Sequence, residues 1–351
     1  MAFPDHPAIA PGSTILVTGA NGFVGAHIAD QLLQYGYKVR GTVRDAGKHG
    51  WLADLFKQKY GREKFELVTV EDMAEDGAFD QAVSGVSGIA HVASVRSTNV
   101  TPEELIRITV AGTLSCLKSA AKEPSVQRFV LTSSSAAVRS LQDYRGSDVV
   151  SAEEYDEKTV ALSKAIPDTL PPMQKSLIAY FASKVRSEQV FWEWVKENRP
   201  HFVANSVLPP TIYGSPLDVA NQGFPSTAKI PLQILDGDTE SLKHVQRWYY
   251  VHVQDVARLH VAGLIHPGAS GERIFAFAGA YSINEFFDVF EKSVPGYKSP
   301  EKIPGLDFPL AAIGPREKAE SLLKDLGRPG FVGLEETIAE SVQTRIHPSS
   351  Q

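Results

Sequence analysis

Hydrophobic residues follow two alternating patterns over the first two hundred positions. Short apolar runs rich in β-branched residues predict strands near 14–18, 38–43, 65–69, 88–92, 128–132 and 202–208. Between them lie longer segments whose apolar residues recur three and four positions apart, which is typical of amphipathic helices. Strands that alternate with helices form a parallel sheet with helices on both faces, joined by right-handed crossovers. The pattern therefore predicts an α/β fold with a doubly wound parallel sheet of the Rossmann type.

The pattern becomes irregular after residue 208. Proline and glycine interrupt residues 209–245, and an apolar stretch within 246–279 then returns to strand and helix. Further helices are expected near 282–293, 316–326 and 334–345. We predict a larger domain of residues 1–208 plus about 246–279. A smaller lobe, of about 209–245 plus 280–351, is expected to cover the edge of the sheet.

A glycine-rich turn follows the first predicted strand. Its spacing is G-x-x-G-x-x-G, and the segment AHIADQLLQYG that comes next is an amphipathic helix ending at Gly36. Glycines in such a turn let the backbone approach a pyrophosphate, whose charge then lies at the helix N-terminus. The spacing differs from the commonest dinucleotide fingerprint, but its position between strand and helix favours a dinucleotide site over an ordinary turn. The expected cofactor contacts in the turn are Gly19, Asn21, Gly22, Phe23, Val24 and Gly25.

The end of the second strand bears on which dinucleotide binds. An acidic residue about twenty positions after the glycine turn usually binds the ribose hydroxyls of NAD. Here Val43 occupies that position, and Arg44 and Lys48 offer cations for the 2′-phosphate of NADP. Arg44 could instead pair with Asp45 or be solvated, and Asp45 could itself serve NAD. The charges favour NADP(H), whereas Arg40 lies nearer the start of the strand, away from the ligand-binding edge.

A tyrosine and a lysine four residues apart lie in a helix predicted over residues 178–197. Positions i and i+4 share one helix face, so Tyr180 and Lys184 point the same way. A phenol has an unperturbed pKa of about 10, and a fixed ammonium nearby lowers that pKa toward working pH. The pair is therefore a candidate proton donor. Tyr60 and Lys64 have the same spacing, but no serine-bearing strand precedes them, and we assign them no role.

Three consecutive serines follow the predicted strand 128–132. They lie at its carboxyl end, which is the edge of a parallel sheet where ligands bind. A serine there can donate a hydrogen bond to a carbonyl oxygen, although serine runs after strands also serve as solvated loops. The spacing alone does not select among Ser133, Ser134 and Ser135. The order of glycine turn, serine cluster and tyrosine–lysine pair predicts a nicotinamide-dependent carbonyl reductase.

Together these motifs resemble those of the extended short-chain dehydrogenases/reductases. The segments YKVRGTVRD, VEDM, GIAHVAS, RFVLTSSSAAV and WYYVHVQDVA are similar to the branch with dihydroflavonol reductases, cinnamoyl-CoA reductases and fungal aldehyde and ketone reductases. The likeness is strongest to the fungal NADPH-dependent aldehyde reductase II type, and it runs nearly end to end. It implies NADPH-dependent reduction of an aldehyde or ketone to an alcohol, with an NADP-binding domain and a substrate-binding lobe.

The resemblance also implies roles for individual residues. It selects Ser134 as the catalytic serine, with Tyr180 as general acid and Lys184 lowering its pKa and holding the nicotinamide ribose. The other implied cofactor contacts are Arg44 and Lys48 at the 2′-phosphate, Asp72 and Met73 at the adenine, Ala93 beside the ribose and pyrophosphate, and Leu208 and Pro209 along the nicotinamide. Pro210 departs from the family pattern, which often has asparagine or glycine there, and this affects the expected shape of the substrate mouth.

Composition agrees with such an enzyme and argues against other classes. With 351 residues, 43% of them hydrophobic, the chain can bury a sizeable core. A net charge of −6 without a dense basic stripe argues against a nucleic-acid partner. The single cysteine, Cys116, lies on an apolar helical stripe and is expected to be a buried hydrophobe in a reducing compartment. No signal-peptide pattern or membrane-length apolar run is present, so the cytoplasm is expected, with no membrane partner.

Several alternatives stay open at this point. The ten histidines are scattered without zinc-site spacing, so no metal is expected, and His91 and His252 are expected to be held within the fold. A nucleotide-sugar epimerase or dehydratase with retained NAD uses the same triad, and a non-catalytic NADP-sensing regulator could keep the fold. The oligomeric state, monomer or homodimer, and the substrate stay open. Pocket-lining residues are expected from 94–98, 135–140 and 209–226 and from the C-terminal lobe.

Overall fold

A seven-stranded parallel sheet is the largest element of the computed structural model, which describes residues 4, 6–95, 100–238, 243 and 246–347. The strand order is β10-β7-β5-β4-β1-β2-β3, and every neighbouring pair is parallel. The strands are β1 (Thr14–Thr18), β2 (Lys38–Val43), β3 (Phe65–Thr69), β4 (Gly88–His91), β5 (Arg128–Thr132), β7 (Val203–Leu208) and β10 (Arg273–Phe275). The predicted doubly wound sheet is confirmed, and the six predicted strands are found within a residue of their expected ends.

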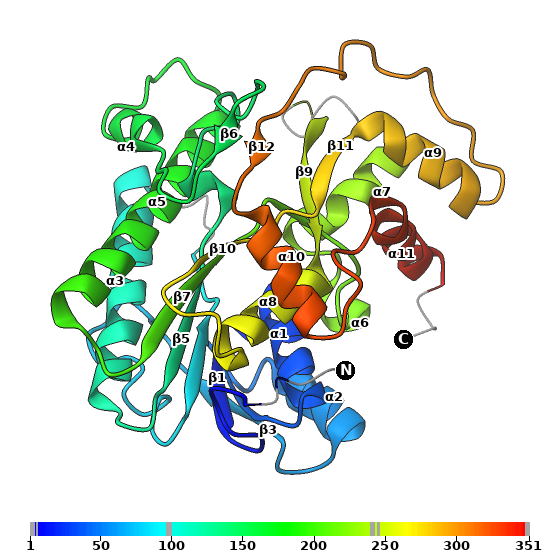
Figure 1. The fold of residues 1–351 in the computed structure, drawn as a ribbon. Helices are drawn as coiled ribbons and strands as arrows, with labels where there is room; N and C mark the ends of the chain where they lie inside the picture. The colour runs from blue at the N-terminus through cyan, green and yellow to red at the C-terminus, as the bar shows by residue number, and fades with distance from the viewer. Residues whose placement is uncertain (1–3, 5, 96–99, 239–242, 244–245, 348–351) are drawn as a thin grey trace.

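Helices cover both faces of this sheet (Figure 1). Alternate residues of a strand point to opposite faces. Ile15 and Val17 accordingly pack in the hydrophobic core beside α1 and α8, whereas Leu16 packs in the core beside α3 and α5. The helices around the sheet are α1 (Phe23–Gln34), α2 (Gly50–Tyr60), α3 (Pro102–Lys122), α4 (Glu157–Ser163), α5 (Pro172–Asn198), α8 (Val253–Ile265) and α10 (Arg316–Asp325). Cys116 lies fully buried in the α3 side of the core, as predicted.

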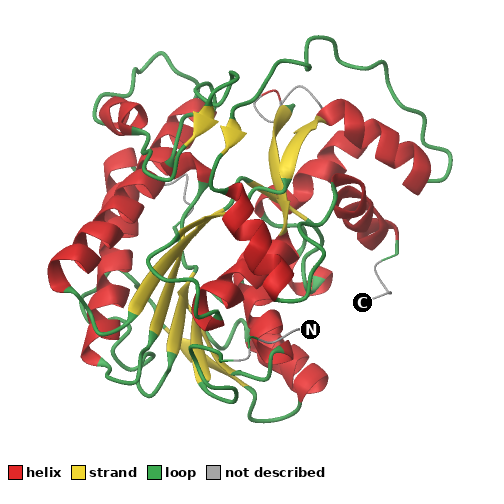
Figure 2. Ribbon diagram, viewed as in Figure 1, coloured by secondary structure: helices red, strands yellow, loops and turns green. Residues whose placement is uncertain are grey.

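A second, smaller group of elements lies beyond the carboxyl edge of the large sheet, and Figure 2 shows its strands apart from the main sheet. Its aromatic core includes Tyr213, Tyr281 and Phe286. The strands are β8 (Thr211–Tyr213), β9 (Arg247–His252) and β11 (Gly279–Ser282), with β6 (Val149–Val150) pairing β12 (Ala312–Ile313). The remaining helices are the 3₁₀ turns η1 (Ser135–Ala137) and η2 (Ser226–Lys229), and α6 (Val219–Gln222), α7 (Ile230–Leu235), α9 (Ile283–Ser293) and α11 (Leu334–Ile346).

The chain crosses between the two groups more than once. The three helices predicted near 282–293, 316–326 and 334–345 are confirmed as α9, α10 and α11. However, α10 packs against α8 and β10 of the large sheet instead of joining the smaller lobe. Residues 246–279 were predicted to return to the larger domain. Within them, α8 and β10 do pack with the large sheet, whereas β9 pairs with β8 and β11. The two-domain division stays a prediction. No described helix is both long and apolar enough to cross a membrane.

Four of the described histidines are buried, namely His27, His91, His252 and His260. Burial lowers the pKa of His27 and His260 to about 4, and burial with the charge of Lys184 lowers that of His91 to about 3. His91 forms a hydrogen bond of 3.1 Å with Thr18 Oγ1, so it is held within the fold as predicted. His252 is likewise held, because its Nε2 lies 2.9 Å from Glu340 Oε2 and its Nδ1 accepts a backbone hydrogen bond.

The three buried histidines with lowered pKa values predict a loss of stability in mild acid. They are neutral in the folded protein, so stability is complete above the unfolded pKa near 6.5 and falls as the pH drops toward 4. At pH 5 each of His27, His91 and His260 should cost about 2 kcal/mol. Urea unfolding at pH 7.5 and pH 5 measures this, and His27→Gln should remove about a third of the difference. Equal free energies of unfolding at the two pH values would contradict the account.

Candidate active site

The carboxyl edge of the sheet has a switch point between β1 and β4, where the strand order reverses. Ligands of open α/β sheets bind at such points. The turns after the two strands touch here, because a Cβ on Gly19 would lie 3.1 Å from Ala93 Cα. Thr18 Oγ1 links them further by accepting hydrogen bonds of 2.9 Å from the N–H groups of Val92 and Ala93. The structure thus brings the predicted residues Gly19 and Ala93 together at the expected edge.

The glycine turn lets backbone approach backbone at the start of α1. Gly19 has φ +64°, a conformation that side chains rarely adopt. A Cβ on Gly25 would lie 2.3 Å from Gly19 O, so only glycine fits there. Gly22 is the N-cap residue, without a side-chain cap, and the first turn of α1 holds no acidic residue. The N–H groups of Phe23, Val24 and Gly25 therefore face outward at the positive end of the helix, which fits a pyrophosphate.

The crowding at Gly25 predicts the effect of one added methyl group. Gly25→Ala should force α1 away from Gly19 O and lower NADPH affinity at least tenfold, since about 1.4 kcal/mol of misfit is a factor of ten. Gly50→Ala is the matched control, because nothing lies within 4 Å of a Cβ at that position. NADPH fluorescence titration of both variants measures the affinities. Equal affinity of Gly25→Ala and the wild type would contradict this reading of the turn.

The cations predicted at the end of β2 differ in their surroundings. Lys48 Nζ lies 2.9 Å from Asp45 Oδ2, and the Lys48 side chain is 80% exposed. Arg44 is exposed directly after β2 and has no ion pair with any residue that the structure describes. The sequence left open a pair between Arg44 and Asp45, but Asp45 pairs with Lys48 instead. Arg40 pairs with Glu66 and donates to Ala82 O and Ser84 O, as expected for a residue remote from the edge.

Asp72 and Met73 follow β3 at the same edge of the sheet. Asp72 is exposed, and its Oδ1 accepts a hydrogen bond of 2.8 Å from the Ala74 N–H. Met73 packs on α3, where a Cβ on Gly112 would lie 2.9 Å from its Cγ. These positions agree with an adenine-binding segment, and that role stays a prediction.

Lys184 connects α5 to the end of β5. Its side chain is buried, and its Nζ donates a hydrogen bond of 3.1 Å to Thr132 O. Tyr180 lies one helical turn earlier on the same helix face and is half-buried. The structure thus places Lys184 of the predicted pair against Thr132, two residues before Ser134, at the carboxyl end of a central strand.

The three serines after β5 differ in exposure and partners. Ser133 and Ser135 are buried, and their N–H groups donate to Val207 O and Pro209 O. Ser134 is half-buried, caps η1, and accepts a hydrogen bond of 3.1 Å at Oγ from Ala136 N. Because η1 packs against α5, Ser134 is the serine whose hydroxyl stays partly accessible beside that helix.

Leu208 and Pro209 end the next strand beside the serine turn. Leu208 is fully buried and accepts a backbone hydrogen bond of 3.1 Å from Ala276, while Pro209 O accepts one of 2.9 Å from Ser135. These bonds place the end of β7 against the Ser134 turn, which agrees with the predicted nicotinamide wall. Residues 96–98 of the expected pocket segment 94–98 lie outside the described part of the chain.

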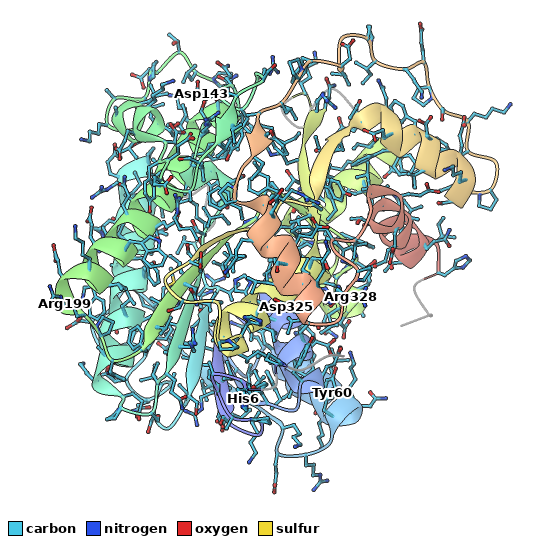
Figure 3. The ribbon with its side chains drawn as sticks, in the orientation of Figure 1. His6, Tyr60, Asp143, Arg199, Asp325 and Arg328 are labelled. Carbon is cyan, nitrogen blue, oxygen red and sulfur yellow. The ribbon has the colours of Figure 1, made fainter. Side chains whose placement is uncertain are left out.

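Tyr60, the tyrosine of the second tyrosine–lysine pair, has a structural role. Tyr60 ends α2, and its hydroxyl donates a hydrogen bond of 2.6 Å to Asp30 Oδ1, which also pairs with Lys59. Burial, reinforced by Asp30, raises the pKa of Tyr60. Figure 3 shows Tyr60 near α2, far across the molecule from Arg199, the residue that follows α5. These contacts agree with the expectation that Tyr60 has no catalytic role.

Sequence reasoning missed Gln222 as a residue of this edge. Its Nε2 donates hydrogen bonds of 3.2 Å and 3.3 Å to Asn21 O and Gly22 O, so α6 lies over the glycine turn. The residue falls within the expected pocket segment 209–226, but no motif marks it. Among the described residues, no group of three or more histidine, cysteine, aspartate or glutamate side chains is arranged to hold a metal ion.

Comparisons with known proteins agree with this geometry. The family model described as "NAD dependent epimerase/dehydratase family" matches residues 15–276. Aldehyde reductase 2 of Sporidiobolus salmonicolor is 37% identical over 97% of this chain and 98% of its own. Ketoreductase adrE of Penicillium roqueforti is 35% identical over 95% of this chain and 97% of its own.

A solved structure has the same fold. It is that of yeast methylglyoxal/isovaleraldehyde reductase Gre2 complexed with NADPH. It is 25% identical, has a TM-score of 0.79, and the match covers 95% of this chain and 99% of the other.

The fold and the site together define an oxidoreductase of the short-chain dehydrogenase/reductase type with a nicotinamide cofactor. Within that class, the chain belongs to the NAD dependent epimerase/dehydratase family, whose members are the extended short-chain dehydrogenases/reductases.

Proposed function

We propose that this protein reduces aldehydes or ketones to alcohols with NADPH. The observation that carries the proposal is the 3.1 Å hydrogen bond from Lys184 Nζ to Thr132 O. It holds the helix bearing Tyr180 against the strand end that leads into Ser134, at the edge where the glycine turn offers a pyrophosphate site. The names of the full-length relatives, an aldehyde reductase and a ketoreductase, support the same reaction class.

Each residue of the proposed triad has one task. Ser134 donates a hydrogen bond to the carbonyl oxygen of the substrate and orients it toward Tyr180. Tyr180 transfers its phenolic proton to that oxygen as the carbonyl carbon is reduced, and the ammonium of Lys184 stabilises the phenolate that remains. NADPH, when bound, supplies the hydride. The products are an alcohol and NADP⁺, and Tyr180 is reprotonated from solvent.

Tyr180→Phe tests the acid assignment. The ring is kept and the proton is lost, so kcat should fall by about 10²–10⁴-fold while NADPH still binds. The assay is NADPH oxidation with an aromatic aldehyde and a β-keto ester, accompanied by fluorescence titration of the cofactor. Tyr60→Phe is the matched control and should retain wild-type turnover, because Tyr60 bonds Asp30 at α2. Wild-type turnover by Tyr180→Phe would refute the assignment.

Arg44 is the proposed principal contact of the 2′-phosphate. Lys48 is already paired with Asp45. This pairing also occupies the Asp45 carboxylate, which could otherwise have bound the ribose of NAD. An arginine fork binds phosphate oxygens in a bidentate manner. The Arg44 guanidinium, which forms an ion pair with none of the described residues, therefore accounts for the proposed preference for NADPH over NADH better than Lys48 does.

Arg44→Ala should reduce kcat/KM with NADPH by about 10–100-fold, the loss of one charge-assisted phosphate contact worth about 1.5–3 kcal/mol. The value with NADH should change less than twofold, because NADH has no 2′-phosphate. Arg62→Ala, which removes an exposed cation just beyond the far end of α2, is the control. Equal losses with both cofactors, or none with NADPH, would exclude Arg44 from this role.

The epimerase or dehydratase alternative makes a different prediction for the purified protein. Such enzymes retain NAD through their catalytic cycle, whereas a reductase exchanges its cofactor at every turnover. Purified protein that carries tightly bound NAD, and turns over no aldehyde or ketone, would replace the proposed function by that alternative.

A further inference from the structure

A fully buried carboxylate lies on the helix that carries the proposed acid. Glu188 has 0% exposure and follows Lys184 by four residues and Tyr180 by eight, so the three share one face of α5. A buried charge is costly unless it is paired and hydrogen-bonded. Nothing in the sequence predicts an acidic residue at position 188, because this face of α5 is the one that packs on the sheet.

Arg273 of β10 pairs with Glu188 in a bidentate arrangement. Its Nε lies 3.0 Å from Oε1 and its Nη2 lies 2.9 Å from Oε2, and Ser206 of β7 donates a hydrogen bond of 2.7 Å to Oε1. The third nitrogen of Arg273 donates to Ala152 O and Glu154 O, and the guanidinium lies 4.2 Å from the Tyr155 ring. Both charges are therefore satisfied, and α5 is tied to two strands and one loop.

This tie lies next to the Lys184 contact. Ser206 is paired with Leu131 in the sheet, one residue before Thr132, whose carbonyl accepts the Lys184 hydrogen bond. The two attachments of α5 to the sheet are thus about one helical turn apart, roughly 6 Å along the helix axis for four residues. Packing and hydrogen bonds to α3 and α4 also hold α5. A bidentate ion pair restrains the height and rotation of the helix on the sheet more tightly than a single hydrogen bond does, because two parallel bonds must keep their geometry together.

We propose that Glu188 and Arg273 are positioning residues that set the height and rotation of α5, and so hold the Lys184 ammonium where it stabilises the Tyr180 phenolate. The inference rests on the proposed function, which it deepens. The pair touches neither substrate nor cofactor in this account and acts only through α5.

Other ionisable groups near the pair keep their charge state between pH 6 and pH 10. Burial raises the pKa of Tyr155 and Tyr144, which face Arg273, so both stay neutral. His91, which faces Lys184, has a pKa of about 3 and also stays neutral. Glu154, beside the loop carbonyls, is paired with Arg139 and stays ionised. These neighbours of the pair therefore add no titration of their own to the alkaline limb of the pH–kcat profile for reduction.

Arg273→Lys separates positioning from a charge effect. It keeps the charge and removes the bidentate fork. If α5 is loosened, the Lys184 ammonium stabilises the phenolate less. The alkaline limb should then move to higher pH. kcat should fall about tenfold, since small misplacements of a catalytic group are costly.

Glu188→Gln and Ser206→Ala complete the series. Removing the carboxylate charge through space would favour the phenolate and move the alkaline limb down, whereas loss of positioning moves it up. An upward shift in Glu188→Gln therefore supports the inference. Ser206→Ala removes only the 2.7 Å hydrogen bond and should give a smaller upward shift, which keeps the test usable if the charge variants do not fold.

Asp255→Asn is the matched control for lost stability. Asp255 is also fully buried and pairs with Arg258 at 2.8 Å, but it lies on α8, on the other face of the sheet. Its Tm should fall comparably while the alkaline limb stays at the wild-type pH. A wild-type limb and kcat in Arg273→Lys, a downward shift in Glu188→Gln, or an equal shift in Asp255→Asn would each overturn the inference. If Tyr180→Phe is inactive and these variants match the wild type, only the positioning inference fails and the proposed function stands.

Discussion

The hydrogen bond from Lys184 Nζ to Thr132 O is the contact on which the arrangement of the site depends. It joins a helix on one face of the sheet to the end of a central strand, and it brings a cation to the edge where the serine turn begins. A buried ammonium needs such partners, because burial disfavours the charged form. The nearby pair of Glu188 and Arg273 makes a second attachment of the same helix, so two polar contacts, one turn apart, join α5 to the sheet, in addition to its packing and hydrogen bonds with neighbouring helices.

The other half of the site is built from backbone. Gly19 meets Ala93 across the switch point, and Gly25 lies against Gly19 O with no room for a side chain. The glycines bring the N-terminus of α1 to the carboxyl edge of β1 and leave its first N–H groups open toward an anion. Side chains then differentiate the two ends of this edge of the sheet. Arg44 offers a cation after β2, whereas Leu208 and Pro209 lie beside the serine turn at the end of β7.

Local patterns were sufficient to predict most of the elements, because the apolar residues of each segment mark the face that it buries. The central parallel strands, such as β1 and β4, are mostly apolar and buried, and amphipathic segments such as 283–293 bury one face. Features that depend on distant residues were not predictable. β9 pairs with β8 and β11, and Glu188 meets Arg273, which lies 85 positions away in the chain. The choice of Asp45 between Arg44 and Lys48 likewise depended on side-chain geometry. The catalytic and cofactor roles rest on the motifs and stay predictions.

Isotope transfer tests the central claim, that a bound nicotinamide and a tyrosine acid jointly reduce a carbonyl at this edge. NADPH carrying deuterium at both C4 positions would be incubated with the wild-type protein and benzaldehyde, and the product analysed by mass spectrometry and proton NMR. With deuterated NADPH in H₂O, the product should be benzyl alcohol that carries one deuterium on the carbinol carbon. With unlabelled NADPH in D₂O, that carbon should acquire no deuterium. Absence of alcohol, or deuterium entering the carbon from solvent, would contradict it.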